Sequence, residues 1–163
     1  MARLVELSGH PAVLPQAVEL VEEYVRLPDA WHGTPPIDLP VWFREELAQF
    51  PGEAMPPRGE VVVGFSSTAA VAVGLLVPFT EQVVEMKRLY VRIESRRTGI
   101  GRLLVGRLVD NARAFGYEKL VLDVMTERHD AVRLYTSLGF VPAEPYRTYE
   151  ALSVELTSLA MEL

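Results

Sequence analysis

The sequence predicts an α+β fold, with a mixed and mainly antiparallel central sheet of about six to seven strands flanked by about four helices. Two observations carry this prediction. Three consecutive runs of β-branched and apolar residues, at 60–65, 69–79 and 82–91, have short connections and favour neighbouring antiparallel strands. From residue 99 onward the apolar period changes to that of a helix, and a further strand follows. This order indicates a βαβ unit in the second half.

The first half adds one strand and two helices to these runs. Residues 2–7 alternate apolar and polar side chains as a half-buried strand does, whereas the valines of 11–26 recur at helical spacing. A proline-rich segment at 27–40 predicts a loop, and a short amphipathic helix is expected at 41–50. A second cluster of proline and glycine, at 51–59, separates this helix from the sheet.

The second half is predicted to alternate between helices and strands. The long helix has one apolar face and ends near Gly116, because glycine readily adopts the left-handed conformation that closes a helix. A strand at 118–125 and a helix at 130–138, closed by Gly139, follow. Two further strands end the chain, the last at 158–163, and the segment between them favours neither structure.

Length and composition limit the number of domains and the classes of partner. The 163 residues show no internal repeat, so we assign 1–163 to a single domain. Cysteine is absent and the three histidines are scattered, which gives no pattern for a metal site. No apolar run approaches the ~20 residues of a membrane helix, and the N-terminus lacks the features of a secretory signal. We therefore expect a cytoplasmic protein with no metal and no membrane partner.

The net charge of -6 argues against nucleic acid as a partner, although basic residues are concentrated in one segment. Residues 1–80 carry 4 basic and 10 acidic side chains, whereas 81–163 carry 12 of each. Between residues 87 and 113, eight basic side chains stand against two acidic ones. A solvated helix face accounts for such a run unless neighbouring residues point to an anion.

Two glycines within the basic segment do point to an anion. The stretch RRTGIGRLL, at 96–104, lies where the strand at 82–91 gives way to the long helix. The first turn of a helix presents unpaired N–H groups and a positive dipole end, and glycine lets an anion approach the backbone closely. Arg96, Arg97 and Arg102 can add forked hydrogen bonds to a phosphate. The expected ligand is a phosphate or pyrophosphate, and the alternative is a tight turn with no ligand.

The same stretch resembles the acetyl-CoA signature of the GNAT superfamily of N-acetyltransferases, [RQ]xxGxG[A/G], at Arg96, Gly99 and Gly101. The segment AVRLYTSLGF further along resembles the AxxLYxxxGF motif of this family, and the two motifs follow the family order. The order of strands and helices also fits, so the resemblance covers nearly the whole chain and implies a GNAT-like fold. A dinucleotide fingerprint, GxGxxG, would need glycine at Leu104.

The resemblance also implies how acetyl-CoA binds, as a cosubstrate and without a metal. The pyrophosphate would lie on the loop and the helix start, and the pantetheine arm would pair with the preceding strand through main-chain contacts. A main-chain N–H of that strand, by spacing that of Leu89, would stabilise the developing oxyanion. The implied cofactor-binding residues are Leu89, Tyr90, Val91, Arg96, Arg97, Thr98, Gly99, Ile100, Gly101 and Arg102.

The resemblance implies two catalytic residues. Tyr135 matches the tyrosine that in many family members protonates or hydrogen-bonds the leaving thiolate of coenzyme A, and its alternative is a core tyrosine. Glu85 matches a catalytic glutamate of some members and would act as general base, directly or through water. Strand alternation sends Glu85 to the same side as Lys87, Leu89 and Val91. The alternative for Glu85 is an exposed carboxylate paired with Lys87 or Arg88.

Several positions leave the acceptor substrate open. Asp123, inside the strand at 118–125, is a second candidate to bind a cationic amine, or it makes a hydrogen bond at a strand bend. Arg128 stands where many family members have asparagine, and it either contacts a cofactor phosphate or lies at the surface. The acidic first half favours a cationic acceptor, and solubility explains the same charge. Candidate pocket residues are Trp31, Trp42, Tyr146 and Tyr149.

The predicted function is an acetyl-CoA-dependent N-acetyltransferase in which a small-molecule or peptide amine attacks directly within a ternary complex. The first alternative is a non-catalytic acyl-CoA-binding or regulatory domain, and the second is a phosphate-binding domain for another nucleotide. Replacing Tyr135 by phenylalanine separates the enzyme from the binding domain, because only the enzyme has turnover to lose. The uneven strands at the C-terminus leave room for a homodimer.

Overall fold

The structure is a computed structural model that describes residues 1–27, 41–148 and 155–163. Strands and helices follow one another in the predicted order. The strands are β1 (Ala2–Glu6), β2 (Glu60–Ser66), β3 (Ala69–Pro78), β4 (Val83–Val91), β5 (Lys119–Met125), β6 (Val141–Pro142) and β7 (Leu156–Glu162). The helices are α1 (Leu14–Val25), α2 (Val41–Ala48), α3 (Ile100–Ala114) and α4 (His129–Ser137), with 3₁₀ turns at Pro11–Val13 and Ile93–Ser95.

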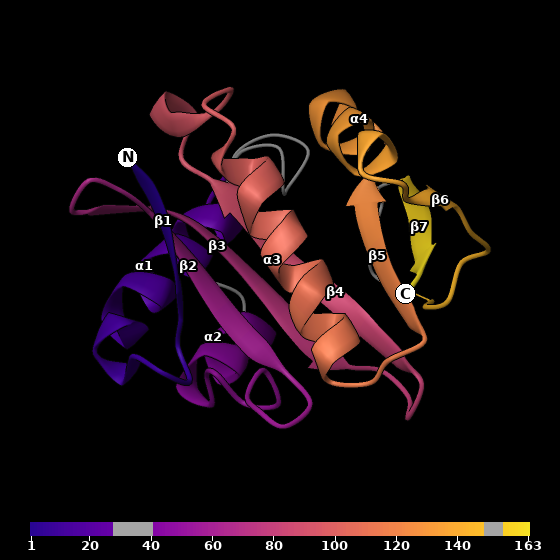
Figure 1. The fold of residues 1–163 in the computed structure, drawn as a ribbon, viewed down its shortest axis with the longest axis horizontal. Coiled ribbons are helices and arrows are strands. Elements are labelled where there is room, and N and C mark those ends of the chain that lie inside the picture. Colours follow the sequence, from indigo (N-terminus) through magenta and orange to yellow (C-terminus); the bar gives the residue numbers. More distant parts are fainter. Residues whose placement is uncertain (28–40, 149–154) are drawn as a thin grey trace.

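The described strands form one mixed sheet in the order β1-β2-β3-β4-β5-β7-β6. Every neighbouring pair is antiparallel except β4 and β5, which are parallel and are joined by α3. A parallel pair needs such a crossover, because a tight turn cannot return the chain to the same end of the sheet. The predicted α+β class with a βαβ unit is therefore confirmed. Figure 1 shows α3 crossing one face of the sheet, and α1 and α2 lie on the opposite face of the sheet.

Each face of the sheet has its own hydrophobic core. α3 and α4 cover one face, where Leu108 and Tyr135 are buried against side chains of β4 and β5. α1 and α2 cover the other face, where Leu20 and Phe43 are fully buried. α3 packs closely on β3 because Gly74 has no side chain, and a Cβ there would lie 2.7 Å from Leu108 Cδ1. The two cores thus join the sheet to helices on both of its faces.

β4 and β5 pair over a short stretch and then part. Their parallel register runs from Val83 opposite Lys119 to Glu85 opposite Val121 and ends there. Beyond Glu85, β4 pairs with β3 alone, so over the described residues the edge of β4 that faces β5 has no strand partner. In Figure 1 the two strands lie close at one end and diverge toward α4.

A bulge in β4 changes which side chains share a face. The register against β3 shifts near Arg88, whose φ of 52° lies in the left-handed region. The β4 side chains that pack in the core under α3 are Val84, Met86, Leu89 and Val91. The predicted alternation, with Glu85 on the side of Leu89 and Val91, is therefore wrong, because the extra residue of a bulge reverses the pattern. Glu85 and Lys87 face the side of α1 and α2 instead.

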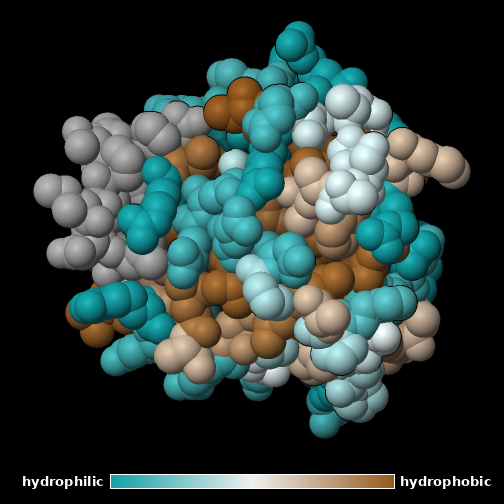
Figure 2. Space-filling model, turned by 90° about the vertical axis from the view of Figure 1, so that its left-hand side faces the viewer, coloured by the Kyte–Doolittle hydropathy of each residue, from teal (hydrophilic) through white to brown (hydrophobic). Residues whose placement is uncertain are grey.

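The side of the molecule that carries β1 and α1 is largely hydrophilic, with apolar residues showing between the polar ones (Figure 2). None of the described helices is long and apolar enough to cross a bilayer. Within the same ranges, no three His, Cys, Asp or Glu side chains lie close enough to hold a metal ion. Trp31, Tyr149, the side chain of Trp42 and nearly all of the predicted loop at 27–40 lie outside the described residues.

Candidate active site

Ion pairs account for part of the basic segment. The pairs are Arg88 with Glu46, Arg92 with Glu19 and Glu23, Arg107 with Glu6, and Arg113 with Asp110. The three arginines around the loop, Arg96, Arg97 and Arg102, form no ion pair with any carboxylate of the described chain. Uncompensated positive charge is therefore concentrated where β4 leads into α3.

The loop backbone leaves room for a bound anion. Gly99 is the N-cap of α3 and has a φ of 90°, which side chains rarely tolerate. A Cβ at Gly99 would meet nothing within 4 Å. Thr98 Oγ1 donates to the Ser95 carbonyl at 2.7 Å and holds the loop, while the buried Ile100 side chain anchors the first turn. The N–H groups of this turn have no acceptor within the helix, so they remain for a ligand.

Neighbouring polar groups hold two of the loop arginines. Arg96 Nε donates to the Val91 carbonyl at 3.1 Å, and Arg102 Nη2 donates to Ser137 Oγ at 2.8 Å. All three loop arginines, including Arg97, are exposed. The contact between Arg102 and Ser137 ties the start of α3 to the end of α4. Cationic side chains therefore surround the N-terminus of α3 without being neutralised.

Over the described residues, the end of β4 that carries Leu89, Tyr90 and Val91 has one edge without a strand partner, and on it the Val91 carbonyl accepts from Arg96 Nε. Its other edge pairs with β3, for example through Tyr90 opposite Val73. The Tyr90 side chain points to α1, where its ring centroid lies 6.3 Å from that of Tyr24, and burial raises its pKa. Main-chain groups along a free strand edge are what an extended ligand needs in order to pair as an added strand.

Tyr135 lies in α4, on the same face of the sheet as α3. It is 5% exposed, and its ring meets that of Phe140 edge-on with the centroids 5.8 Å apart. Burial raises the pKa of Tyr135 above its ordinary value, and the positive charge of Arg128 acts in the opposite direction. The phenol is therefore protonated at neutral pH and able to donate a hydrogen bond.

Glu85 lies in a buried cluster that the sequence did not predict. The residue is 2% exposed, and Oε2 accepts from Arg147 Nη2 at 2.6 Å and from Arg147 Nε at 3.1 Å. Oε1 accepts from the Tyr146 hydroxyl at 3.1 Å. Phe79 supports both partners, with the Arg147 guanidinium 4.9 Å from its ring centroid and the Tyr146 ring edge-on at 5.3 Å. The alternative of an exposed carboxylate paired with Lys87 or Arg88 is therefore wrong, because Glu85 is buried and its ion pair is with Arg147.

Two more ionisable side chains lie near the point where β4 and β5 part. Lys87 is two residues beyond Glu85, and burial lowers its pKa while the charge of Glu85 acts in the opposite direction. Asp123 on β5 accepts a hydrogen bond from Ser158 Oγ of β7 at 2.6 Å. Asp123 therefore makes a contact within the sheet, as one of its two sequence interpretations expected.

The family model described as "Acetyltransferase (GNAT) family" matches residues 18–140, which contain the loop, β4 and Tyr135. The chain belongs to this family. An uncharacterized N-acetyltransferase of Schizosaccharomyces pombe is 50% identical over 62 residues, which are 38% of this chain and 38% of that protein. An uncharacterized N-acetyltransferase of Dictyostelium discoideum is 39% identical over 82 residues, which are 50% of this chain and 38% of that protein. The chain thus spans well under half the length of these curated relatives.

A solved structure shows the same fold. A putative acetyltransferase of Salmonella typhimurium, solved with its cofactor acetyl-CoA, has a TM-score of 0.73 at 19% identity, over 98% of this chain and 93% of that chain. The predicted GNAT-like fold and family are therefore confirmed.

Three features of this GNAT chain fit coenzyme A. Open space at Gly99 and uncompensated arginines suit the phosphates, and the free edge of β4 suits the pantetheine arm. The predicted cofactor residues lie along one path, from the N-terminus of α3 to the end of β4. Tyr135 and Glu85 face opposite sides of the sheet, so they flank the divergence of β4 and β5 rather than contact each other.

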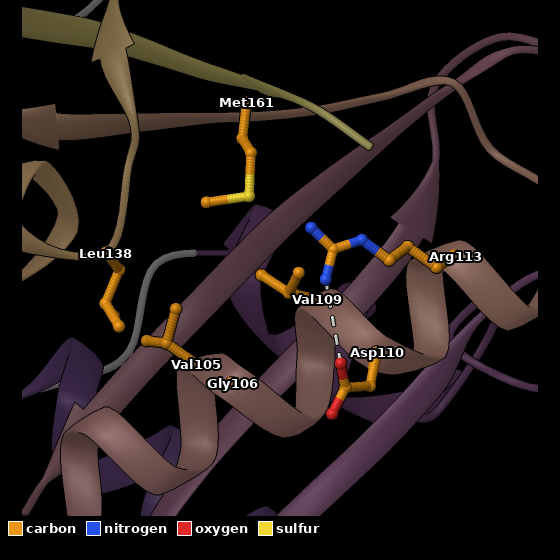
Figure 3. Close-up of a pocket in the computed structure, with 7 residues that line it drawn as sticks. All are labelled: Val105, Gly106, Val109, Asp110, Arg113, Leu138 and Met161. Carbon is orange, nitrogen blue, oxygen red and sulfur yellow. Dashed lines mark ion pairs between the residues drawn. The ribbon is translucent and has the colours of Figure 1, made fainter.

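A separate hollow of about 220 Å³ lies beside the middle of α3 (Figure 3). It is lined by Val105, Gly106, Val109, Asp110, Arg113, Leu138 and Met161. Asp110 and Arg113 pair at its rim, with 3.8 Å between Oδ1 and Nη1. None of the predicted site residues lines this hollow, so it lies outside the candidate active site.

Proposed function

We propose that this GNAT protein transfers an acetyl group from acetyl-CoA to a primary amine of a small molecule or peptide, by direct attack within a ternary complex. The observation that carries the proposal is the loop at Gly99. It combines open backbone donors with three arginines that lack a carboxylate partner in the described chain, beside a strand edge free for the pantetheine arm.

In the proposed reaction, the amine nitrogen attacks the thioester carbonyl, a C–N bond forms and the C–S bond breaks. The main-chain N–H of Leu89 stabilises the oxyanion that develops on the carbonyl. Tyr135 donates its proton to the leaving thiolate, which its protonated state at neutral pH supports. The proton lost by the amine balances the one given to the thiolate.

Glu85 is the proposed general base, acting directly or through water. Its burial at the last paired position of β4 with β5 supports this role, because an acceptor amine entering between the strands would meet it there. The ion pair with Arg147 orients the carboxylate. The hydrogen bond from Tyr146 fixes the second oxygen.

The experiment measures two quantities for the natural chain and Tyr135→Phe: release of coenzyme A thiol with a panel of amines, and binding of acetyl-CoA by calorimetry. We expect the variant to lose about 100-fold in kcat, as for removal of a general acid, and to keep its affinity for acetyl-CoA. A binding domain would bind acetyl-CoA without any turnover. Competition by ADP or NAD as strong as that by coenzyme A would favour a site for another nucleotide.

A further inference from the structure

Arg128 occupies a position between three elements of the candidate active site. It is the N-cap residue of α4 and directly follows the turn that leaves β5. Its guanidinium carbon lies 5.3 Å from the centroid of the Tyr24 ring of α1. Its charge also acts on Tyr135 of α4. Arg128 therefore reaches from the end of β5 toward α1, across the region where β4 and β5 have parted.

Two nitrogens of Arg128 are buried without a hydrogen-bond partner. Both Nε and Nη2 are inaccessible to solvent, and neither donates to any acceptor of the described chain. The face of the Tyr24 ring offsets part of the charge, but it leaves these two N–H groups unpaired. Leaving a buried charged donor unpaired is costly, and such groups in native structures are normally satisfied. A ligand that supplies the missing acceptors would remove this cost.

The two unpaired donors, Nε and Nη2, form one edge of the guanidinium plane, and this edge can bind both oxygens of a carboxylate. Three other arginines of this protein use the same edge in this way. Arg88 donates to Glu46 from Nε at 3.1 Å and Nη2 at 2.6 Å, and Arg147 donates to Glu85 from Nε at 3.1 Å and Nη2 at 2.6 Å. Arg92 uses the same two nitrogens on Glu23. The free edge of Arg128 therefore has the geometry of a carboxylate site.

Coenzyme A does not supply the missing group well. Its phosphates have a site at the N-terminus of α3, whereas Arg128 caps a different helix. Arg128 caps the helix that carries Tyr135, the residue proposed to meet the thiol, and its guanidinium lies against Tyr24. The pantetheine arm offers neutral amide carbonyls there, and these cannot neutralise a guanidinium. Among the described residues no carboxylate reaches these two nitrogens, so we look for the carboxylate in the acceptor substrate.

We propose that the Nε and Nη2 edge of Arg128 binds a carboxylate of the acceptor, so that the substrate is a small amino carboxylate such as an α-amino acid. This inference rests on the proposed acetyl transfer and names its substrate class. An α-amino acid carries its amine and carboxylate on one carbon. Its carboxylate can therefore lie against Arg128 beside Tyr135 while the amine meets the thioester. The sequence predicted a cationic acceptor, and this inference changes the predicted acceptor to a zwitterion.

The test compares acceptors that differ only in the carboxylate. The twenty proteinogenic amino acids are assayed for release of coenzyme A thiol, and each one that reacts is compared with its amide and its decarboxylated amine. We expect a kcat/KM about 10- to 100-fold higher for the free acid, the range of a charge-assisted hydrogen-bonded pair. Arg128→Met removes this preference, and Arg128→Lys restores only part of it because lysine lacks the fork.

Two further measurements separate a binding role from a structural one. Acetyl-CoA affinity should be unchanged in Arg128→Met, and the ligand-free variant should melt at a higher temperature, because a buried unpaired charge has been removed. Arg133→Met is the matched control on the same helix. Arg133 pairs with Asp130 at the surface, where its side chain is 74% exposed, so its loss should change neither the carboxylate preference nor the affinity for acetyl-CoA.

Several results would overturn the inference. Equal kcat/KM for acids and amides would do so, as would a loss of acetyl-CoA affinity in Arg128→Met, since Arg128 would then act on the cofactor. A protein that binds acetyl-CoA and acetylates other amines, but no amino acid, would retain the proposed function and lose this substrate class. A protein that does not bind acetyl-CoA would lose both.

Discussion

The cofactor loop and the acceptor side of the candidate active site are built in different ways. The loop gathers Arg96, Gly99 and Arg102 within a few residues, and its arginines are exposed. The acceptor side, formed by Glu85, Tyr146, Arg147 and Arg128, joins the buried Glu85 to Arg147, which is 62 residues further along the chain and 34% exposed. A contiguous site can be recognised as a motif, whereas a site assembled from distant segments depends on how the sheet is folded.

The two regions also treat positive charge differently. The loop leaves three arginines without carboxylates because a solvated guanidinium is stable until an anion arrives. Arg88 and, on the acceptor side, Arg147 each bind a carboxylate, whereas Arg128 binds none in the described chain. An exposed charge without a partner costs little free energy, because water solvates it. A buried charge without a partner is costly, so it is stronger evidence that a ligand binds there.

The largest expected effect comes from adding a negative charge at the start of α3. Gly101→Glu places a carboxylate in the first turn of α3, where it competes with a phosphate for the backbone N–H groups. We expect affinity for acetyl-CoA to fall by about 100-fold or more, measured by calorimetric titration. Gly106→Glu is the control in the same helix, because a Cβ at Gly106 meets nothing within 4 Å, and one at Gly101 meets only Leu134 Cδ2 and Val91 Cγ2 at ordinary contact distances of 3.5 and 3.6 Å. Equal losses in both variants would show that the loop is not the phosphate site.

The next effect tests the buried pair on the acceptor side. Glu85→Gln removes the negative charge that faces Arg147, and we expect unfolding free energy to fall by about 1 to 3 kcal/mol in chemical denaturation. Acetylation should fall as well, while acetyl-CoA affinity is retained. The double variant Glu85→Gln with Arg147→Met should recover part of the stability, because it removes the charge left behind. A fully stable single variant would show that the pair contributes nothing.

A smaller effect should appear at Lys87 as a dependence on pH. Burial lowers the pKa of Lys87 below its ordinary value of 10.5, so the unfolded chain binds its proton more tightly than the folded one. Lys87 therefore opposes folding at neutral pH, and this opposition fades as pH rises through the folded pKa toward 10.5. We expect Lys87→Met to raise the melting temperature at pH 7 and to lose this advantage near pH 10. A constant difference across this range would contradict the prediction.

The smallest effect is expected at the surface. Arg107 pairs with Glu6 at 3.3 Å, and both side chains are at least a third exposed. Arg107→Gln should change unfolding free energy by less than about 1 kcal/mol, because water screens an exposed pair. Acetyl-CoA affinity should not change either, although Arg107 belongs to the same basic segment as the loop arginines. A large loss of affinity would extend the phosphate site along α3.

Particular residues show where sequence analysis succeeded and failed. The apolar runs and the helical spacing after Gly99 predicted the order of elements, because each pattern depends only on residues close together in the sequence. The predicted side of Glu85 was wrong because the bulge at Arg88 depends on how β4 meets β3. Arg147 was missed as the partner of Glu85 because nothing in its own segment marks it.

The sequence by itself determined the α+β class, the family and the position of the loop that we propose for the cofactor, since local periodicity and a short motif suffice for each. Tertiary structure decided which basic side chains are neutralised, where β4 and β5 part, and which face Glu85 takes. It also decided that Arg128 has two buried donors without acceptors. These properties depend on distances between segments far apart in the chain, and only packing around the two cores sets those distances.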